Sequence, residues 1–253
     1  MFSISLFDFL SVALEATIRM SDESRLLGGA RGNLLPLLKN ELDAILSDDA
    51  HHVLNERPGF VGLAYREIIP GNRAVLDTKF EDRDHVIDSV CNSSMFPFFS
   101  SNWPFRFSRK LENQKTSLLP RIAVDGYFSV GRDRFGCPDF ENMKHDRDDE
   151  YVVDRTVTLS VFPHDVIKLD ASEKHDQISP TIDPENQGQL GNLFRLATEC
   201  AEKEDYYKLY EDGWKDSEQW LKEEESRVGY WGAMTNMQRR KIYSEALKAK
   251  DLN

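Results

Sequence analysis

The chain has 253 residues, of which 40% are hydrophobic and 30% are charged, and its formal net charge is −12. This length allows one or two domains with a sizeable core, and the composition is ordinary for a soluble globular protein. The acidic excess argues against a nucleic-acid partner and against steady electrostatic docking on an anionic membrane, because both need a basic face.

The sequence contains no segment typical of a membrane span or a signal peptide. No run of about 18 uncharged apolar residues occurs. The first ten residues are apolar, but they lack a basic start and include Asp8, which favours a buried helix or strand. The three cysteines, Cys91, Cys137 and Cys200, are odd in number and widely spaced, a pattern that favours reduced thiols over disulfides or a zinc site.

Two helices are predicted near the amino terminus. Apolar side chains recur at helical intervals over residues 8–20 and again over residues 34–47. Between them lies a Gly-rich break. Asn33 is placed to cap the second helix, and Pro36 is tolerated in its first turn.

A change of hydrophobic period after residue 49 predicts a β-hairpin. Residues 61–65 alternate as in a strand, the Pro-Gly-Asn run at residues 70–72 predicts a turn, and residues 74–76 predict the strand that pairs back. A short helix is expected over residues 82–94, ended by its Asn-Ser-Ser cluster.

The middle of the chain mixes a loop with two predicted strands. Residues 100–118 are interpreted as an irregular loop, and Ile122-Ala123-Val124 as a short strand. The β-branched run over residues 156–162 predicts a central strand, and an extended connection is expected over residues 165–185.

From about residue 184 the pattern becomes helical. A helical region is expected from residue 190 to Leu221, and a last helix from Thr235, where Gln238 completes a capping box. The alternation of strand and helix in the first 165 residues predicts an α/β domain with a largely covered sheet, followed by a helical appendage.

Asp125-Gly126 is the one local feature that could carry catalysis. It directly follows the predicted strand over residues 122–124. In α/β sheets ligands bind beyond the carboxyl ends of the strands, where this carboxylate would lie. Asp-Gly is also among the commonest turn dipeptides, so an ordinary turn is the alternative interpretation.

Five stretches in chain order resemble the patatin-like phospholipases, in particular the branch that includes the animal triglyceride lipases. They are the helix over residues 34–46 with the run 48–51 after it, the strand pair around residues 61–63 and 73–76, the helix ending in residues 89–98, the run Ile122-Ala123-Val124-Asp125-Gly126, and the strand over residues 156–162. The resemblance extends over roughly residues 10–165.

The resemblance implies a three-layer α/β/α domain with a serine–aspartate dyad. In that chemistry the serine attacks an ester carbonyl of a lipid and the aspartate takes its proton. A Gly-rich loop donates backbone N–H groups to the oxyanion. Only the aspartate of the dyad maps onto this sequence, at Asp125, and Gly126 completes its motif. No metal ion and no organic cofactor are implied.

The nucleophile of the family does not map onto the chain. Gly-x-Ser-x-Gly, the sharp turn that exposes such a serine, occurs nowhere in the 253 residues. Gly28 and Gly32 have the right spacing, but Ala30 lies between them, and an interhelical turn is the better interpretation. By the family order the elbow and the oxyanion loop would precede Met1, and residues 8–20 would be the rest of the helix after the elbow.

Two further departures concern the surroundings of the motif. Tyr127 stands where the family commonly has a small residue, so its side chain would crowd the site. The Asn-x-Pro of the family is not clear, and Gly136-Cys137-Pro138 is interpreted as a displaced counterpart.

Other polar and aromatic groups are interpreted structurally. His51-His52 and His164 are not tied to a serine by spacing, so a surface or helix-end role is favoured. Ser93-Ser94 is explained as the stop of a helix. The Tyr and Trp stripe over residues 206–220 could touch a lipid interface, but its many acidic neighbours favour docking onto the core.

These observations predict an incomplete patatin-like domain over residues 1–183, without its first strand and elbow, and a helical extension over residues 184–253. The parent function is hydrolysis of lipid carboxylic esters, and the chain as written is expected to be inactive, as a truncated enzyme or a pseudoenzyme. The alternative is a non-catalytic lipid- or protein-binding protein. Expected partners are a lipid ester at a membrane or lipid-droplet surface and a protein bound by the C-terminal helices. The expected location is intracellular, cytoplasmic or peripheral to such a surface.

Overall fold

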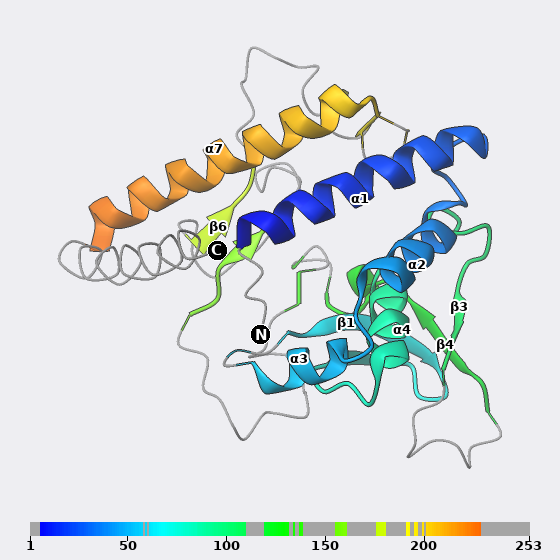
Figure 1. Cartoon of the computed structure of the whole chain (residues 1–253). Helices are drawn as coiled ribbons and strands as arrows, with labels where there is room; N and C mark the ends of the chain where they lie inside the picture. The colour runs from blue at the N-terminus through cyan, green and yellow to red at the C-terminus, as the bar shows by residue number, and fades with distance from the viewer. Residues whose placement is uncertain are drawn as a thin grey trace.

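The computed structural model is a mixed α/β structure of long helices and a small antiparallel sheet (Figure 1). The structure describes residues 6–57, 59, 61–109, 119–131, 134, 137–138, 155–160, 176–180, 191–192, 195–196, 199 and 201–228. The coarse α/β class predicted from the sequence is therefore confirmed.

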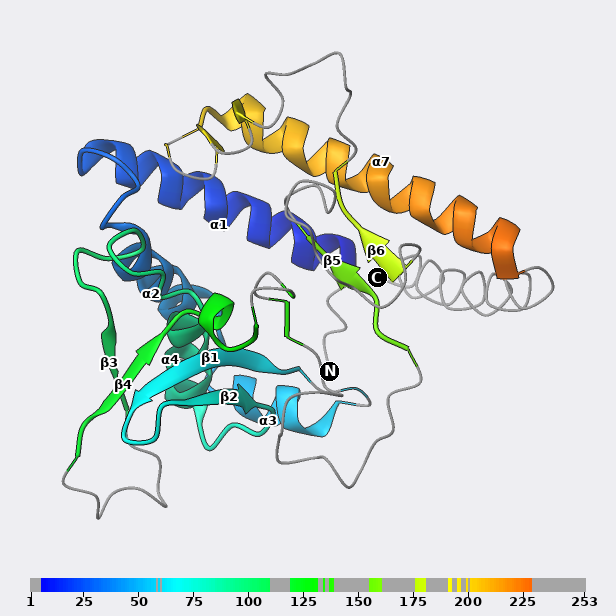
Figure 2. The same cartoon turned by 180° about the vertical axis from the view of Figure 1, so that it is seen from behind.

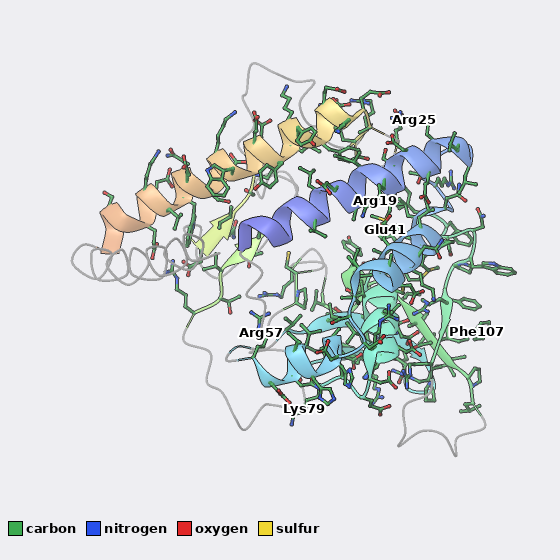
Figure 3. All side chains as sticks on the ribbon, viewed as in Figure 1. Arg19, Arg25, Glu41, Arg57, Lys79 and Phe107 are labelled. Carbon is green, nitrogen blue, oxygen red and sulfur yellow. The ribbon has the colours of Figure 1, made fainter. Side chains whose placement is uncertain are left out.

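The two predicted N-terminal helices are present as α1, Leu6–Leu26, and α2, Leu34–Ile45. The Arg19 guanidinium on α1 donates a hydrogen bond to the Glu41 carboxylate on α2, with 2.7 Å between Nη2 and Oε2, and both side chains are labelled in Figure 3. Asn33 occupies the N-cap position of α2, but its side chain makes no cap hydrogen bond. Its amide donates instead to the Gly29 carbonyl oxygen at 2.8 Å, so it stabilises the preceding turn.

A third helix, α3 (Ala50–Glu56), occupies a segment for which the sequence analysis predicted no helix. The segment has seven residues, about two helical turns, and is too short to show a period of its own. Asn55 on α3 fixes the segment that leads into the helix beginning at Arg83, because its side-chain amide donates to the Phe80 carbonyl oxygen at 2.8 Å.

The main sheet has the strand order β2-β1-β4-β3, and all of its neighbouring strands are antiparallel. The predicted hairpin is formed by β1 (Leu63–Ile69) and β2 (Arg73–Asp77). The predicted strand 122–124 is β4, Arg121–Val124. The stretch expected to be only a loop contains β3, Arg106–Ser108, which pairs with β4.

One helix, α4 (Arg83–Ser93), packs directly on this sheet and begins as predicted. Its N-cap Asp82 accepts a hydrogen bond from the His85 N–H at 2.8 Å. Helices α2 and α3 pack on α4, so the helical layer lies on one face of the sheet. Figure 2 shows the molecule from behind, where no described α-helix covers the sheet; the short 3-10 helix η2, Gly126–Phe128, follows the end of β4 and contacts both β1 and α4. Among the described residues, the main sheet is thus covered by α-helices on one face, where the family resemblance implied helices on both.

A buried ion pair lies at the centre of the sheet. Glu67 on β1 and Arg121 on β4 are 1% and 3% exposed, and their side chains meet at 2.7 Å. Arg121 also donates to the Tyr65 hydroxyl at 2.7 Å. Burial raises the pKa of Tyr65, so this hydroxyl keeps its proton. Both charged groups of the pair thus have hydrogen-bond partners, which a charge needs in order to be stable in a low-dielectric interior.

The expected central strand over residues 156–162 is wrong for the residues that the structure describes. Only Thr158–Leu159 forms a strand, β5, and it pairs in parallel with β6, Gln177–Ile178, in a separate two-stranded sheet. The side chain of Leu159 is exposed, which a central strand would not allow. Residues 161–162 lie outside the described part of the chain.

The predicted C-terminal helical region contains α7, Lys203–Val228, which runs antiparallel to α1 in both views (Figures 1 and 2). The entry to α7 is fixed on α1, because Ser21 and Arg25 both donate to the Ala201 carbonyl oxygen, at 3.2 and 2.8 Å. The predicted last helix from Thr235 lies outside the described residues. None of the described helices is long and apolar enough to cross a membrane.

Candidate active site

Asp125 lies where the sequence placed it, directly after the carboxyl end of β4. Its backbone N–H donates to the Met95 carbonyl oxygen at 2.9 Å, which ties the end of the strand to the loop after α4. The neighbouring strands β1 and β3 are antiparallel to β4. The end of β4 therefore lies at the same edge of the sheet as the beginnings of β1 and β3. The edge at which Asp125 lies therefore belongs to an antiparallel sheet.

The Asp125 carboxylate is partly buried and has no cationic partner among the described residues. Its Oδ1 accepts the Tyr127 N–H at 2.7 Å, and among the described residues no cation forms an ion pair with it. Burial raises the pKa of this carboxyl to about 6, and the Tyr127 N–H lowers it only in part. A carboxyl with this pKa can exchange a proton near neutral pH, as a general base must.

The Asp125–Tyr127 hydrogen bond is also the one that an ordinary Asp-Gly turn requires. The side chain thus caps η2, the 3-10 turn that follows the strand. This bond uses only Oδ1, and the described residues give Oδ2 no partner. The turn interpretation and the base interpretation are therefore compatible, since each uses a different oxygen.

Gly126 is required by the close approach of two backbone segments. A Cβ atom at this position would lie 2.5 Å from the Ala64 carbonyl oxygen on β1 and 3.4 Å from the Ser93 Oγ. The first distance is a clash with backbone, which cannot move aside cheaply. The glycine of the motif therefore lets η2 lie flat against β1 and fixes the direction in which Asp125 leaves the strand.

Aromatic rings form a wall along η2, the turn that the Asp125 side chain caps. The Tyr127 ring lies 5.2 Å from the Phe128 ring and 6.0 Å from the Phe96 ring, measured between centroids. The three rings come from η2 and from the loop after α4. Tyr127, expected to crowd the site, thus contributes its N–H to Asp125 and its ring to this wall.

The other candidates keep the structural roles expected of them. His51 and His52 begin α3, where their rings stack at 4.1 Å. Gly28 and Gly32 lie in the turn between α1 and α2, each with a positive φ that favours glycine. Ser93 ends α4 and Ser94 is its C-cap. His164 lies outside the described residues, as does Gly136 of the run 136–138.

A second cluster, which the sequence analysis did not single out, contains the residue types of a catalytic triad. Ser89 donates to Asp77 Oδ2 at 2.6 Å, and His85 Nε2 lies 3.5 Å from the same oxygen. His85 Nδ1 accepts the Glu81 N–H at 3.1 Å. The serine is bonded to the carboxylate and not to the imidazole, and Ser89 is fully buried, so this cluster joins α4 to β2 and cannot attack a substrate.

The aromatic stripe of α7 is only partly docked. Tyr206, Tyr210 and Trp220 are half-buried, whereas Tyr207 and Trp214 are exposed. Arg155 lies 5.8 Å from the Trp220 ring and also binds Asp176 and Glu224, so it joins the small β5–β6 sheet to α7.

Free thiols and acidic groups do not build a metal centre in the described part of the chain. Cys91 and Cys137 are free cysteines there. No group of three or more histidine, cysteine or acidic side chains among the described residues is arranged to hold a metal ion.

Comparisons of the chain with models of protein families, with curated proteins and with solved structures found no match.

Proposed function

We propose that this chain carries the base half of a lipid ester hydrolase site of the patatin-like type. Asp125 takes the proton from a serine hydroxyl that lies outside the 253 residues. The serine oxygen forms a bond to the ester carbonyl carbon, and the alcohol leaves with the proton that Asp125 returns. Water then hydrolyses the acyl-serine by the same proton transfers.

The observation that carries the proposal is the state of the Asp125 carboxylate. It is a partly buried acid at the end of a strand, one of its oxygens has no partner among the described residues, and its pKa is raised to about 6. A carboxylate with a purely structural role is normally paired, as Asp82 is with Arg109, whose hydrogen bond lowers the pKa of that acid. An acid with a raised pKa and without an ion-pair partner among the described residues favours proton transfer.

A second function is favoured by the absence of Gly-x-Ser-x-Gly from the sequence. Without a nucleophile the same edge of the sheet would be a lipid-binding surface of a non-catalytic protein. The two functions differ in one requirement, which is a serine brought within reach of Asp125.

The first experiment treats the purified chain with a serine-directed fluorophosphonate probe and with short-chain nitrophenyl esters. We expect no stoichiometric label and no hydrolysis above background, because the described residues provide no activated serine. Ser93 is the hydroxyl to watch, since its Oγ lies beside Gly126. Labelling that disappears in Ser93→Ala but persists in Ser94→Ala would replace the proposal with a site complete in this chain.

The second experiment supplies the missing serine. Mapping the 5′ end of the messenger RNA shows whether an in-frame Gly-x-Ser-x-Gly precedes Met1, and the longer reading frame is then expressed. We expect ester hydrolysis that falls by about 10²–10⁴ in Asp125→Asn, the usual contribution of a general base. A message without such a motif favours the binding protein, and an extended enzyme indifferent to Asp125→Asn refutes the role of Asp125.

A further inference from the structure

Two loops expose large apolar side chains to solvent. The end of α1 and the turn after it carry Leu26 and Leu27, which are 87% and 60% exposed. The loop between α4 and β3 carries Phe98 and Trp103, which are 56% and 70% exposed. Such side chains contribute little to folding when they remain in water, and a patch of this kind usually marks a binding surface.

Backbone and side-chain hydrogen bonds join the two loops into one surface. The Gly32 N–H donates to the Phe99 carbonyl oxygen at 2.6 Å, and the Leu35 N–H donates to the Ser100 carbonyl oxygen at 2.8 Å. The Arg31 side chain donates to the Phe98 carbonyl oxygen at 3.1 Å. In Figure 3, Arg25 at the end of α1 and Phe107 on β3 lie along the same edge of the molecule, and Phe107 points away from it.

Phe98 is held in a conformation that disfavours its own residue type. Its φ is +58°, in the left-handed region that glycine and asparagine adopt most readily. The ring is also more than half exposed, so it gains little from burial. A bulky aromatic residue at such a position lowers the stability of the isolated fold, which indicates that the ring contributes elsewhere.

The surface lacks the carboxylates that are abundant elsewhere in the chain. The protein has 44 acidic residues, yet no Asp or Glu occurs in residues 24–40 or 93–111. At the end of α1, Asp22 is paired with Arg25, which also meets Glu202, and the exposed Glu23 lies one helical turn before Leu27. Arg31 is exposed and lies between the two loops. Leu, Phe and Trp beside an Arg, with carboxylates only at the α1 margin, suit the ester and phosphate zone of a lipid surface.

The same surface is continuous with the Asp125 site. The loop that exposes Phe98 begins at Met95, whose carbonyl oxygen accepts the Asp125 N–H. Phe96, also exposed, lies against the Phe128 ring at 5.6 Å. A lipid surface in contact with this loop would therefore lie beside the end of β4.

We infer that Leu26, Leu27, Phe98 and Trp103 form an interfacial anchor that inserts into a phospholipid–water interface. The inference rests on the proposed function for the nature of the ligand, and it assigns the surface that presents the lipid to Asp125. The net charge of −12 opposes an anionic membrane, so the fitting surface is zwitterionic.

The experiment is flotation of the full chain with phosphatidylcholine vesicles, with and without phosphatidylserine. We expect binding to phosphatidylcholine that added phosphatidylserine does not strengthen. Trp103→Ser and Phe98→Asn should each weaken binding by about tenfold or more, the worth of one large apolar side chain. Trp214→Ser is the matched control, because Trp214 is 49% exposed on α7, away from this surface, and should leave binding unchanged.

Phe98→Asn separates lost binding from lost folding. Asparagine tolerates the positive φ, so the variant should melt about 2 °C or more above the wild type while it loses vesicle binding. Vesicle binding that is absent, or that is equal in Trp103→Ser and Trp214→Ser, overturns the anchor. So does concentration-dependent dimerisation abolished by Trp103→Ser without vesicle binding, which would assign the surface to a second copy. Asp125→Asn should bind vesicles like the wild type, so failure of the base and failure of the anchor are distinguishable.

Discussion

Replacing Asp125 with asparagine keeps the shape of the side chain and an oxygen that can accept the Tyr127 N–H, but it removes the ionisable group. Folding raises the pKa of the carboxyl from 3.8 to about 6. Ionising it therefore disfavours the folded state by up to about 3 kcal/mol. At pH 7 the asparagine variant should be more stable than the wild type by up to that amount.

The sign of the pH dependence follows from which state binds the proton more tightly. The folded pKa is the higher one, so the contribution of Asp125 to stability is fully present below about pH 4 and is lost as the pH rises through about 6. Urea unfolding between pH 4 and pH 8 measures this loss as a growing gap between wild type and Asp125→Asn. Asp48→Asn is the control, because Asp48 is exposed in the turn before α3.

The result that would refute the reasoning is a gap that does not grow with pH, or one that Asp48→Asn reproduces. Either outcome would mean that the Asp125 carboxylate is solvated or paired in the folded chain. The electrostatic support for its role as a base would then be lost, although its position at the end of β4 would stand.

Two further predictions concern the frame that holds the site, and urea unfolding measures both. Arg121→Met leaves Glu67 buried without its closest partner and should destabilise the fold by about 3–5 kcal/mol. Arg73→Met removes an exposed partner of the same acid and should destabilise the fold by less than about 1 kcal/mol. Equal losses of stability in the two variants would contradict the role of the buried pair. Gly126→Ala places a Cβ 2.5 Å from the Ala64 carbonyl oxygen and should lower the free energy of unfolding by about 1–3 kcal/mol. In Gly28→Ala the added Cβ meets no atom, so that variant measures only the destabilisation due to the positive φ of Gly28. A Gly126→Ala chain as stable as the wild type would contradict the close approach of η2 to β1.

Elements with strong local signals were predictable from the sequence. The Pro-Gly-Asn turn and the alternation around it located the β1–β2 hairpin, and the Asp82 cap located the start of α4. Both signals act within a few residues. The end of β4 was found in the same way, because an apolar run stops abruptly at Asp125.

Features that depend on distant partners were not predictable. β3 has three residues, with Phe107 exposed and Ser108 buried, and becomes a strand only because β4 pairs with it. The run over residues 156–162 has strong β propensity, yet its described part pairs through two residues only. Hydrophobic period does not encode strand direction, so beyond the β1–β2 hairpin the antiparallel pairing of the sheet was not predicted. The raised pKa of Asp125 depends on burial by several segments at once, which its dipeptide could not reveal.

The antiparallel contact between α1 and α7 sets the order of events during synthesis. Ser21 and its acceptor, the Ala201 carbonyl oxygen, are 180 residues apart. At about 5–20 residues per second, a ribosome needs roughly 10–40 s to deliver that acceptor after Ser21 has been made. During that interval α1 has α2 to pack against but lacks α7, so the nascent chain should benefit from a chaperone that shields the α7-facing side of α1 until α7 emerges.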